Sequence, residues 1–152
     1  METIWHPTIA VTCIIQNQGR YLILKRHSNK NKWPNKWTFP GGKVTEEDFK
    51  GTPTAINNQW YGALENACLR EIKEETGINT YKISSLKYLC NIAIPDTLIV
   101  SYVANLITGE EKPIIKIQEE ECSEYKWVSL YEACNIDLID GLLHELQMAE
   151  EL

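Results

Sequence analysis

The spacing of hydrophobic residues along the chain predicts several short strands joined by turns. β-Branched and apolar residues alternate with clusters of Gly, Pro, Asn and Asp, which is typical of strands and turns. The predicted strands are Thr8–Ile15, Arg20–Arg26, Trp37–Phe39, Leu86–Ala93, Thr97–Leu106 and Tyr125–Val128. The polar residues 27–36 show no periodicity, so we expect a loop there.

The spacing becomes helical further along the chain. A helix is predicted from Gln59 to Thr76, with Trp60 at the start of its apolar face, and a second, amphipathic helix from Asp140 to Glu150. Residues 43–58 are rich in turn formers and are expected to be mostly loop. Strands, a helix, more strands and a last helix predict a mixed sheet with helices packed on it.

The predicted central helix carries a cluster of carboxylates. Residues three and four positions apart share a helix face, so Glu71, Glu74 and Glu75 lie together. Their charges raise the free-energy cost of ionising one another, and a divalent cation removes that cost. Mg²⁺ prefers carboxylate oxygens. The cluster therefore predicts a Mg²⁺ site, with Mn²⁺ as the alternative ion; an exposed acidic face without metal is the alternative interpretation.

Composition and charge narrow the class of protein. The chain has 152 residues, of which 43% are hydrophobic and 24% charged, as expected of one soluble globular domain. The net charge is −6, yet residues 3–45 hold no acidic residue. A basic first third favours an anionic ligand and an acidic centre favours a cation, while ordinary surface charge is the alternative.

We expect a cytoplasmic location and no membrane partner. The five cysteines form no CxxC pair, which predicts reduced, mostly buried thiols. The first residues lack a basic leader, and no run approaches the ~20 apolar residues of a membrane helix.

Two motifs together resemble a known family. Residues 70–78 read Arg-Glu-Ile-Lys-Glu-Glu-Thr-Gly-Ile, and residues 41–44, Gly-Gly-Lys-Val, precede them. They are similar to the signature of Nudix hydrolases, which runs Gly, five residues, Glu, seven residues, then Arg-Glu-apolar-x-Glu-Glu-x-Gly-apolar. The likeness extends to Leu24-Lys25-Arg26, to Trp37-Thr38-Phe39-Pro40 and to Trp127-Val128-Ser129-Leu130, and so covers most of the chain.

The resemblance implies one Nudix domain over residues 1–152, an α+β fold in which a mixed, curved sheet lies between helices as an α/β/α sandwich. It implies Mg²⁺-dependent cleavage of a nucleoside diphosphate linked to another group, such as a nucleoside triphosphate, to a nucleoside monophosphate and a second phosphate product. It assigns metal binding to Glu71, Glu74 and Glu75, and catalysis to Glu74, Glu71 and Arg70. The planar fork of Arg70 is expected to brace these carboxylates.

Such sites often use one more glutamate outside the signature, and its position varies within the family. Glu119, Glu120 and Glu121 precede the last predicted strand. We take Glu120 as the candidate base and Glu121 as the candidate metal ligand, with an acidic surface loop as the alternative.

The candidate substrate-binding residues are Arg26, Gly41, Gly42, Lys43 and Trp33. The glycines would let the backbone approach a ligand or adopt positive φ, unless they form a plain turn. The basic residues would meet phosphates, unless they are surface charges. Trp33 lies in a polar loop and is the best candidate for stacking on a base.

The signature is interrupted. Counted from the glycines, Asp48 occupies the position of its first glutamate, but residues 49–69, 21 positions, separate it from Arg70 where the family has seven. We expect an insertion at about residues 49–62. Residues 49–58 would form a flap that helps to select the substrate, and Trp60 would pack on the core from an added helical turn.

Two other functions remain open. A nucleotide-binding or sensor module of Nudix fold would bind without hydrolysis. An RNA-end pyrophosphohydrolase would need a broad basic and aromatic surface, and the negative net charge argues against nucleic acid as a partner. Whether the chain forms a homodimer is left open.

Overall fold

The computed structural model describes residues 1–53 and 56–152. Within them, seven strands form one sheet. The strands are β1 (Thr8–Asn17), β2 (Arg20–Arg26), β3 (Trp37–Thr38), β4 (Gly41–Lys43), β5 (Lys87–Ile94), β6 (Thr97–Asn105) and β7 (Cys122–Val128). The helices are α1 (Glu47–Lys50), α2 (Ala63–Thr76), α3 (Leu130–Ala133) and α4 (Leu142–Glu150), with a 3₁₀ turn, η1, at Thr80–Lys82.

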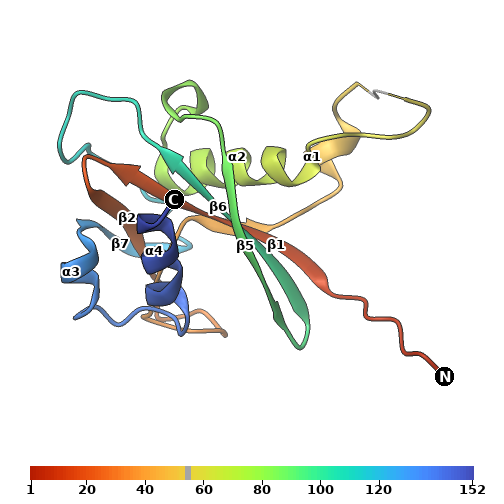
Figure 1. Cartoon of the computed structure of the whole chain (residues 1–152), viewed down its shortest axis with the longest axis horizontal. Coiled ribbons are helices and arrows are strands. Elements are labelled where there is room, and N and C mark those ends of the chain that lie inside the picture. Colours follow the sequence, from red (N-terminus) through yellow and green to blue (C-terminus); the bar gives the residue numbers. More distant parts are fainter. Residues whose placement is uncertain (54–55) are drawn as a thin grey trace.

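The sheet is mixed, as predicted. Its main order is β3-β2-β1-β6-β5, with β4 pairing with β1 and β7 with β2. The long central pair, β1 with β6, is parallel from Thr8 opposite Thr97 to Gln16 opposite Asn105, and the other pairs are antiparallel. The sheet is curved and open, and it lies between α2 on one face and α3 and α4 on the other (Figure 1). The predicted α/β/α sandwich is confirmed.

Each face of the sheet has its own core. Ala67, Cys68 and Ile72 of α2 pack on alternate residues of β1 and β2, including Val11 and Leu22. On the opposite face, side chains from α4 pack on a second set of buried residues from β1, β2 and β3. Because helices cover both faces, the centre of β2 is a continuous buried run and does not alternate.

Most predicted elements match the structure within one to three residues, and three predictions were wrong. Residues 41–43, for which no strand was predicted, form strand β4 on β1. Residues 47–50, expected to be loop, form helix α1. The central helix begins at Ala63 and not at Gln59, because Gly62 has φ 80°, a left-handed conformation that does not continue a helix.

The insertion folds partly on itself. The rings of Phe49 and Trp60 lie 5.5 Å apart, and Trp60 Nε1 donates a hydrogen bond to Thr52 O at 2.9 Å. Trp60 therefore packs within the insertion, and the prediction that it packs on the core was wrong. The described residues of the insertion extend away from the sheet beside the N-terminal end of α2 (Figure 1). The predicted flap includes residues 54 and 55, which lie outside the described residues.

No helix in residues 1–53 and 56–152 is long and apolar enough to cross a membrane. All five cysteines are free, and three of them, Cys13, Cys68 and Cys122, are buried.

Candidate active site

The C-terminal half of α2 lies against the glycine strand β4. A Cβ atom on Gly42 would lie 2.4 Å from the Glu71 carboxylate, and one on Gly41 would lie 2.2 Å from the carbonyl oxygen of Val11 in β1. Neither glycine has positive φ. These positions therefore need glycine because of close packing, one against the carboxylate and one against the neighbouring strand.

Arg70 contacts two members of the carboxylate cluster. Its Nη1 donates to Glu71 Oε1 at 2.8 Å and to Glu74 Oε2 at 3.1 Å, while its Nη2 donates to the carbonyl oxygen of Lys43 at 3.0 Å. The predicted bracing of the glutamates by Arg70 is confirmed. The same contacts tie the glycine strand to α2.

Asp48 completes this arrangement from across the insertion. Arg70 Nε donates to Asp48 Oδ1 at 2.6 Å and Nη2 to Asp48 Oδ2 at 3.1 Å. The Asp48 side chain is only 1% exposed. The Arg70 guanidinium and the backbone N–H of Thr45 hold the pKa of Asp48 below its usual value. Although the signature is interrupted, folding brings the residue at its first acidic position back to the arginine.

Glu75 is the buried member of the cluster. Its residue is 8% exposed, and burial together with the neighbouring Glu71 carboxylate raises its pKa well above the usual range. The backbone N–H of Gly41 donates to this carboxylate and acts in the opposite direction, while Glu121 lies close enough to raise the pKa further. Two glutamates of α2 and one from the turn before β7 therefore share one neighbourhood.

The three predicted glutamates before β7 have different positions. Glu121, half exposed, pairs with Lys30 and lies near Glu75. Glu119 and Glu120 are exposed on the same turn. The structure thus brings Glu121 to the cluster, and the role of Glu120 as a base stays a prediction.

The carboxylate oxygens of the cluster are the kind of ligand that a hard divalent cation prefers. In the described part of the chain, no three Asp, Glu, His or Cys side chains converge as metal ligands. Three of the carboxylates pair instead with cations, Glu71 and Glu74 with Arg70 and Glu121 with Lys30. Glu71 and Glu75, however, lie together beneath a strand that leaves no space for a side chain, and every donor is an oxygen, as Mg²⁺ prefers.

The candidate phosphate-binding residues lie around this cluster. Neighbours on a strand face opposite ways, and Lys25 pairs with Glu124 at 3.3 Å and lies over the Trp37 ring. Arg26 lies on the other side, where its charge, like that of Lys30, lowers the pKa of the buried Cys122 thiol. Arg26 Nε donates to the carbonyl oxygen of Lys32 at 2.9 Å, and the binding of phosphate by Arg26 stays a prediction.

Two further candidates sit at its edges. Lys43 ends β4 with an exposed side chain. Trp33 is 39% exposed in the loop between β2 and β3, with φ 49°. Its ligand contact stays a prediction.

Sequence reasoning missed the contribution of Lys30, and it placed Asp48 at the first acidic position of the signature without predicting its pairing with Arg70. The pairs Lys30–Glu121 and Asp48–Arg70 join residues 91 and 22 positions apart. The basic composition of residues 27–36 was the one available signal for Lys30.

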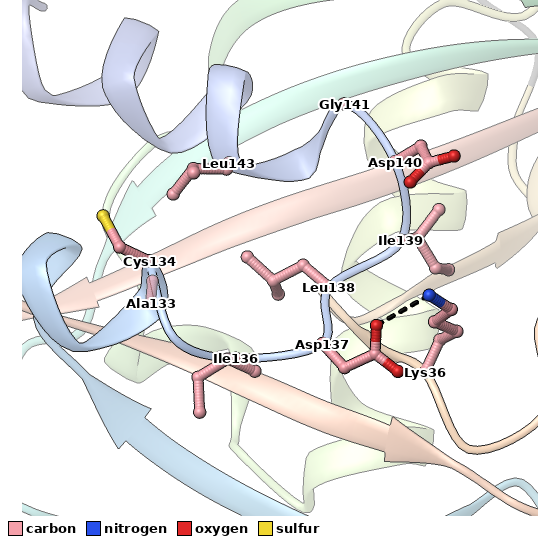
Figure 2. Close-up of a pocket in the computed structure, with 10 residues that line it drawn as sticks. All are labelled: Lys36, Ala133, Cys134, Ile136, Asp137, Leu138, Ile139, Asp140, Gly141 and Leu143. Carbon is pink, nitrogen blue, oxygen red and sulfur yellow. Dashed lines mark hydrogen bonds and ion pairs between the residues drawn. The ribbon is translucent and has the colours of Figure 1, made fainter.

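Two shallow hollows lie elsewhere in the described residues. One of about 240 Å³ opens beside the α3–α4 connection, where Lys36 pairs with Asp137 at 2.6 Å (Figure 2). The other, of about 330 Å³, lies beyond the C-terminal end of α2. The predicted site residues line neither hollow.

The chain is similar to known proteins in sequence and in fold. The NUDIX domain model matches residues 5–146. The chain is 30% identical over 114 residues to ADP-ribose pyrophosphatase of Methanocaldococcus jannaschii, a match that covers 70% of this chain and 56% of that protein. It is 24% identical over 151 residues to nudix hydrolase 7 of Caenorhabditis elegans, covering 82% of this chain and 51% of that protein. The chain thus spans about half the length of the curated relatives it matches.

Solved structures share the fold. The MutT protein of Methanosarcina mazei Go1 is 24% identical, and the match covers 99% of this chain and 98% of that protein with a TM-score of 0.68. The NUDIX domain of NrtR from Shewanella oneidensis, solved in complex with ADP-ribose, is 20% identical, with coverages of 97% and 89% and a TM-score of 0.71.

Proposed function

The chain belongs to the Nudix family, and we propose that it hydrolyses a nucleoside diphosphate linked to a second group, in a reaction that depends on Mg²⁺. The products would be a nucleoside monophosphate and a second phosphate compound. The family match over residues 5–146 supports the hydrolase class. The substrate and the metal dependence are inferred from the site.

One observation carries the proposal. Glu75 is buried beside Glu71 and beneath the glycine strand, so two carboxylates share surroundings that favour neutralising one of them. A fold gains no stability from such a pair, which a leucine could replace. The arrangement is understandable if a cation normally occupies it.

The residues around the cluster match what the reaction needs. A diphosphate is protected by its own charge, so hydrolysis needs that charge offset, a water aligned with phosphorus and a base. Mg²⁺ bound by Glu71, Glu74, Glu75 and Glu121 would supply Lewis-acid chemistry. Arg70 keeps the glutamates oriented through its bonds to Glu71 and Glu74.

The remaining groups would act on the substrate itself. Arg26 and Lys43 would hold phosphate oxygens that do not react, and Trp33 would stack on the base. A glutamate of the cluster, or Glu120, would accept the proton of the attacking water.

ADP-ribose is the first substrate to test, since the relative that is 30% identical is named for that activity. The experiment incubates the protein with ADP-ribose, nucleoside triphosphates, dinucleoside polyphosphates and nucleotide sugars, with Mg²⁺ or with chelator. Mg²⁺-dependent release of a nucleoside monophosphate from at least one compound is expected. Binding of a nucleotide without release from any of them would contradict the proposal and favour the binding module.

A further inference from the structure

The loop between β2 and β3, residues 27–36, brings one lysine to the glutamate cluster. The Lys30 ammonium pairs with the Glu121 carboxylate. The Lys30 side chain is 23% exposed and that of Glu121 is 45% exposed, so the pair lies at the surface of the site.

Backbone contacts hold Lys30 in this position. His27 N–H donates to Glu121 O at 3.1 Å, and Lys30 N–H donates to His27 O at 3.2 Å, which closes a turn over the start of β7. The Cys122 thiol reports on the surrounding charges. Burial and the nearby charges of Glu75 and Glu121 raise its pKa, Arg26 and Lys30 lower it, and the net result is a pKa of about 12. These cations and carboxylates are therefore close neighbours.

The other lysines of the loop have different partners. Lys32 Nζ lies 2.9 Å from Asp96 at the turn between β5 and β6, and Lys36 Nζ lies 2.6 Å from Asp137 before α4. Neither aspartate belongs to the glutamate cluster. Lys32 therefore offers a matched comparison for Lys30, since it has the same charge, the same loop and a similar ion pair away from the site.

We propose that Lys30 exchanges partners when the site is loaded: it pairs with Glu121 in the metal-free protein and binds a phosphate of the substrate once a divalent cation has taken Glu121. This inference rests on the proposed function. An ammonium and a divalent cation compete for one carboxylate because like charges repel at such distances. The freed ammonium stays on a flexible stem beside Arg26, where an anionic diphosphate offers it a new partner.

The test measures two binding constants by calorimetry for wild type, Lys30→Ala, Lys30→Arg and Lys32→Ala. The first titrates Mn²⁺ alone. The second titrates methylene-bridged ADP, whose P–C–P link resists hydrolysis, into protein with saturating Mn²⁺. Melting temperatures confirm that each variant is folded.

Opposite changes are expected in Lys30→Ala. Mn²⁺ alone should bind about two- to fivefold more tightly, because Glu121 has lost its competing cation. The diphosphate should bind about tenfold more weakly, because a charged hydrogen bond is lost. Lys30→Arg should restore much of the diphosphate affinity, and Lys32→Ala should match wild type in both titrations.

Changes of the same sign in Lys30→Ala, or none, would overturn the role of Lys30, since a merely structural residue weakens both affinities. Such a result with normal wild-type binding leaves the proposed function standing. A wild-type protein that binds neither Mn²⁺ nor the diphosphate would contradict both proposals at once.

Discussion

The two faces of the sheet each bury one glutamate, and comparing the two shows what distinguishes a candidate site from a structural feature. Glu75 on α2 is 8% exposed and Glu145 on α4 is 6% exposed. Burial raises the pKa of both carboxyls. By burial and by pKa direction, the two residues are alike.

Their neighbours are different. Ser101 Oγ donates to Glu145 Oε1 at 2.7 Å, Thr12 Oγ1 lies 2.8 Å from Ser101 Oγ, and the Cys90 thiol lies 3.9 Å from the carboxyl. Hydroxyls and a thiol thus satisfy Glu145 within the fold. Glu75 instead lies beside Glu71 and near Glu121. These two carboxylates pair with cations, Glu71 with Arg70 and Glu121 with Lys30. The neighbours of a buried acid, more than its burial, indicate its role.

The largest expected effect is on turnover, and it should distinguish Glu75 from Glu145 directly. Glu75→Gln removes a proposed metal ligand and should lower turnover by at least ~100-fold, as should Glu74→Gln, because loss of a ligand would weaken or displace the cation. Glu145→Gln, a matched change on the opposite face, should keep near-normal turnover. The measurement is the steady-state rate on the best substrate of the screen. Near-normal rates in both Glu74→Gln and Glu75→Gln would remove the basis for the metal assignment.

The next effect concerns the link between Asp48 and Arg70. Asp48→Asn replaces a buried charged partner and should lower the free energy of unfolding by about 1–3 kcal/mol at pH 7. Because the folded-state pKa of Asp48 lies below its usual value of 3.8, the stabilisation is present above that pH and is lost as the pH falls through the folded-state pKa.

Urea unfolding of both proteins across this pH range measures the effect. The difference in the free energy of unfolding between wild type and Asp48→Asn should become smaller below pH 3.8. Glu46→Gln, which breaks an exposed ion pair between the residue that precedes α1 and Lys50 at its end, is the control and should change little. A difference that does not depend on pH would show that the charge of Asp48 is not the source of the stability.

The insertion should affect specificity more than chemistry. Replacing residues 50–57 by two glycines leaves every glutamate of the cluster in place and removes Thr52, the hydrogen-bond partner of Trp60. Folding and Mn²⁺ binding should persist, while the ratio of kcat/KM for the two best substrates should change by ~10-fold. An unchanged ratio would show that the insertion is a passive spacer, and loss of folding would show that it belongs to the core.

The smallest effect concerns the structural glutamate. The raised pKa of Glu145 means that the native protein keeps this proton to higher pH than the unfolded chain, so wild-type stability falls as the pH rises from about 4.5 through the folded-state pKa. Glutamine can still accept the hydrogen bond from Ser101 and does not titrate.

Glu145→Gln should therefore become more stable than wild type as the pH rises through that window, by a few degrees in Tm at most, the shift that ~1 kcal/mol produces in a domain of this size. Thermal melts from pH 4.5 to 8 measure the difference. A variant that loses stability with rising pH as steeply as wild type would contradict this assignment.

The sequence predicted the parts of the fold that depend on local pattern. The long strands follow from runs of apolar residues, and Gly77, with φ 72°, ends α2 where expected. Helix α1 and strand β4 were missed because each is four residues or fewer and depends on distant contacts. The start of α2 was misplaced because the apolar pattern runs on to Trp60 although Gly62 is left-handed.

The site was predictable to a similar extent. Helical spacing placed Glu71, Glu74 and Glu75 together, and the fork of Arg70 reaches two of them as expected. Contacts between residues far apart in sequence, such as Lys30 with Glu121, come from sheet pairing and loop geometry, which periodicity does not encode.

The most direct test of the metal site is to locate the ion. Crystals soaked in Mn²⁺ should show an anomalous-difference peak within about 2.0–2.6 Å of carboxylate oxygens of Glu71, Glu74 and Glu75, with Glu121 turned away from Lys30. Crystals of Glu75→Gln should lose the peak or show it much weakened, whereas crystals of Glu145→Gln should keep it. A peak elsewhere on the molecule, or no peak in wild-type crystals, would contradict a metal centre on α2.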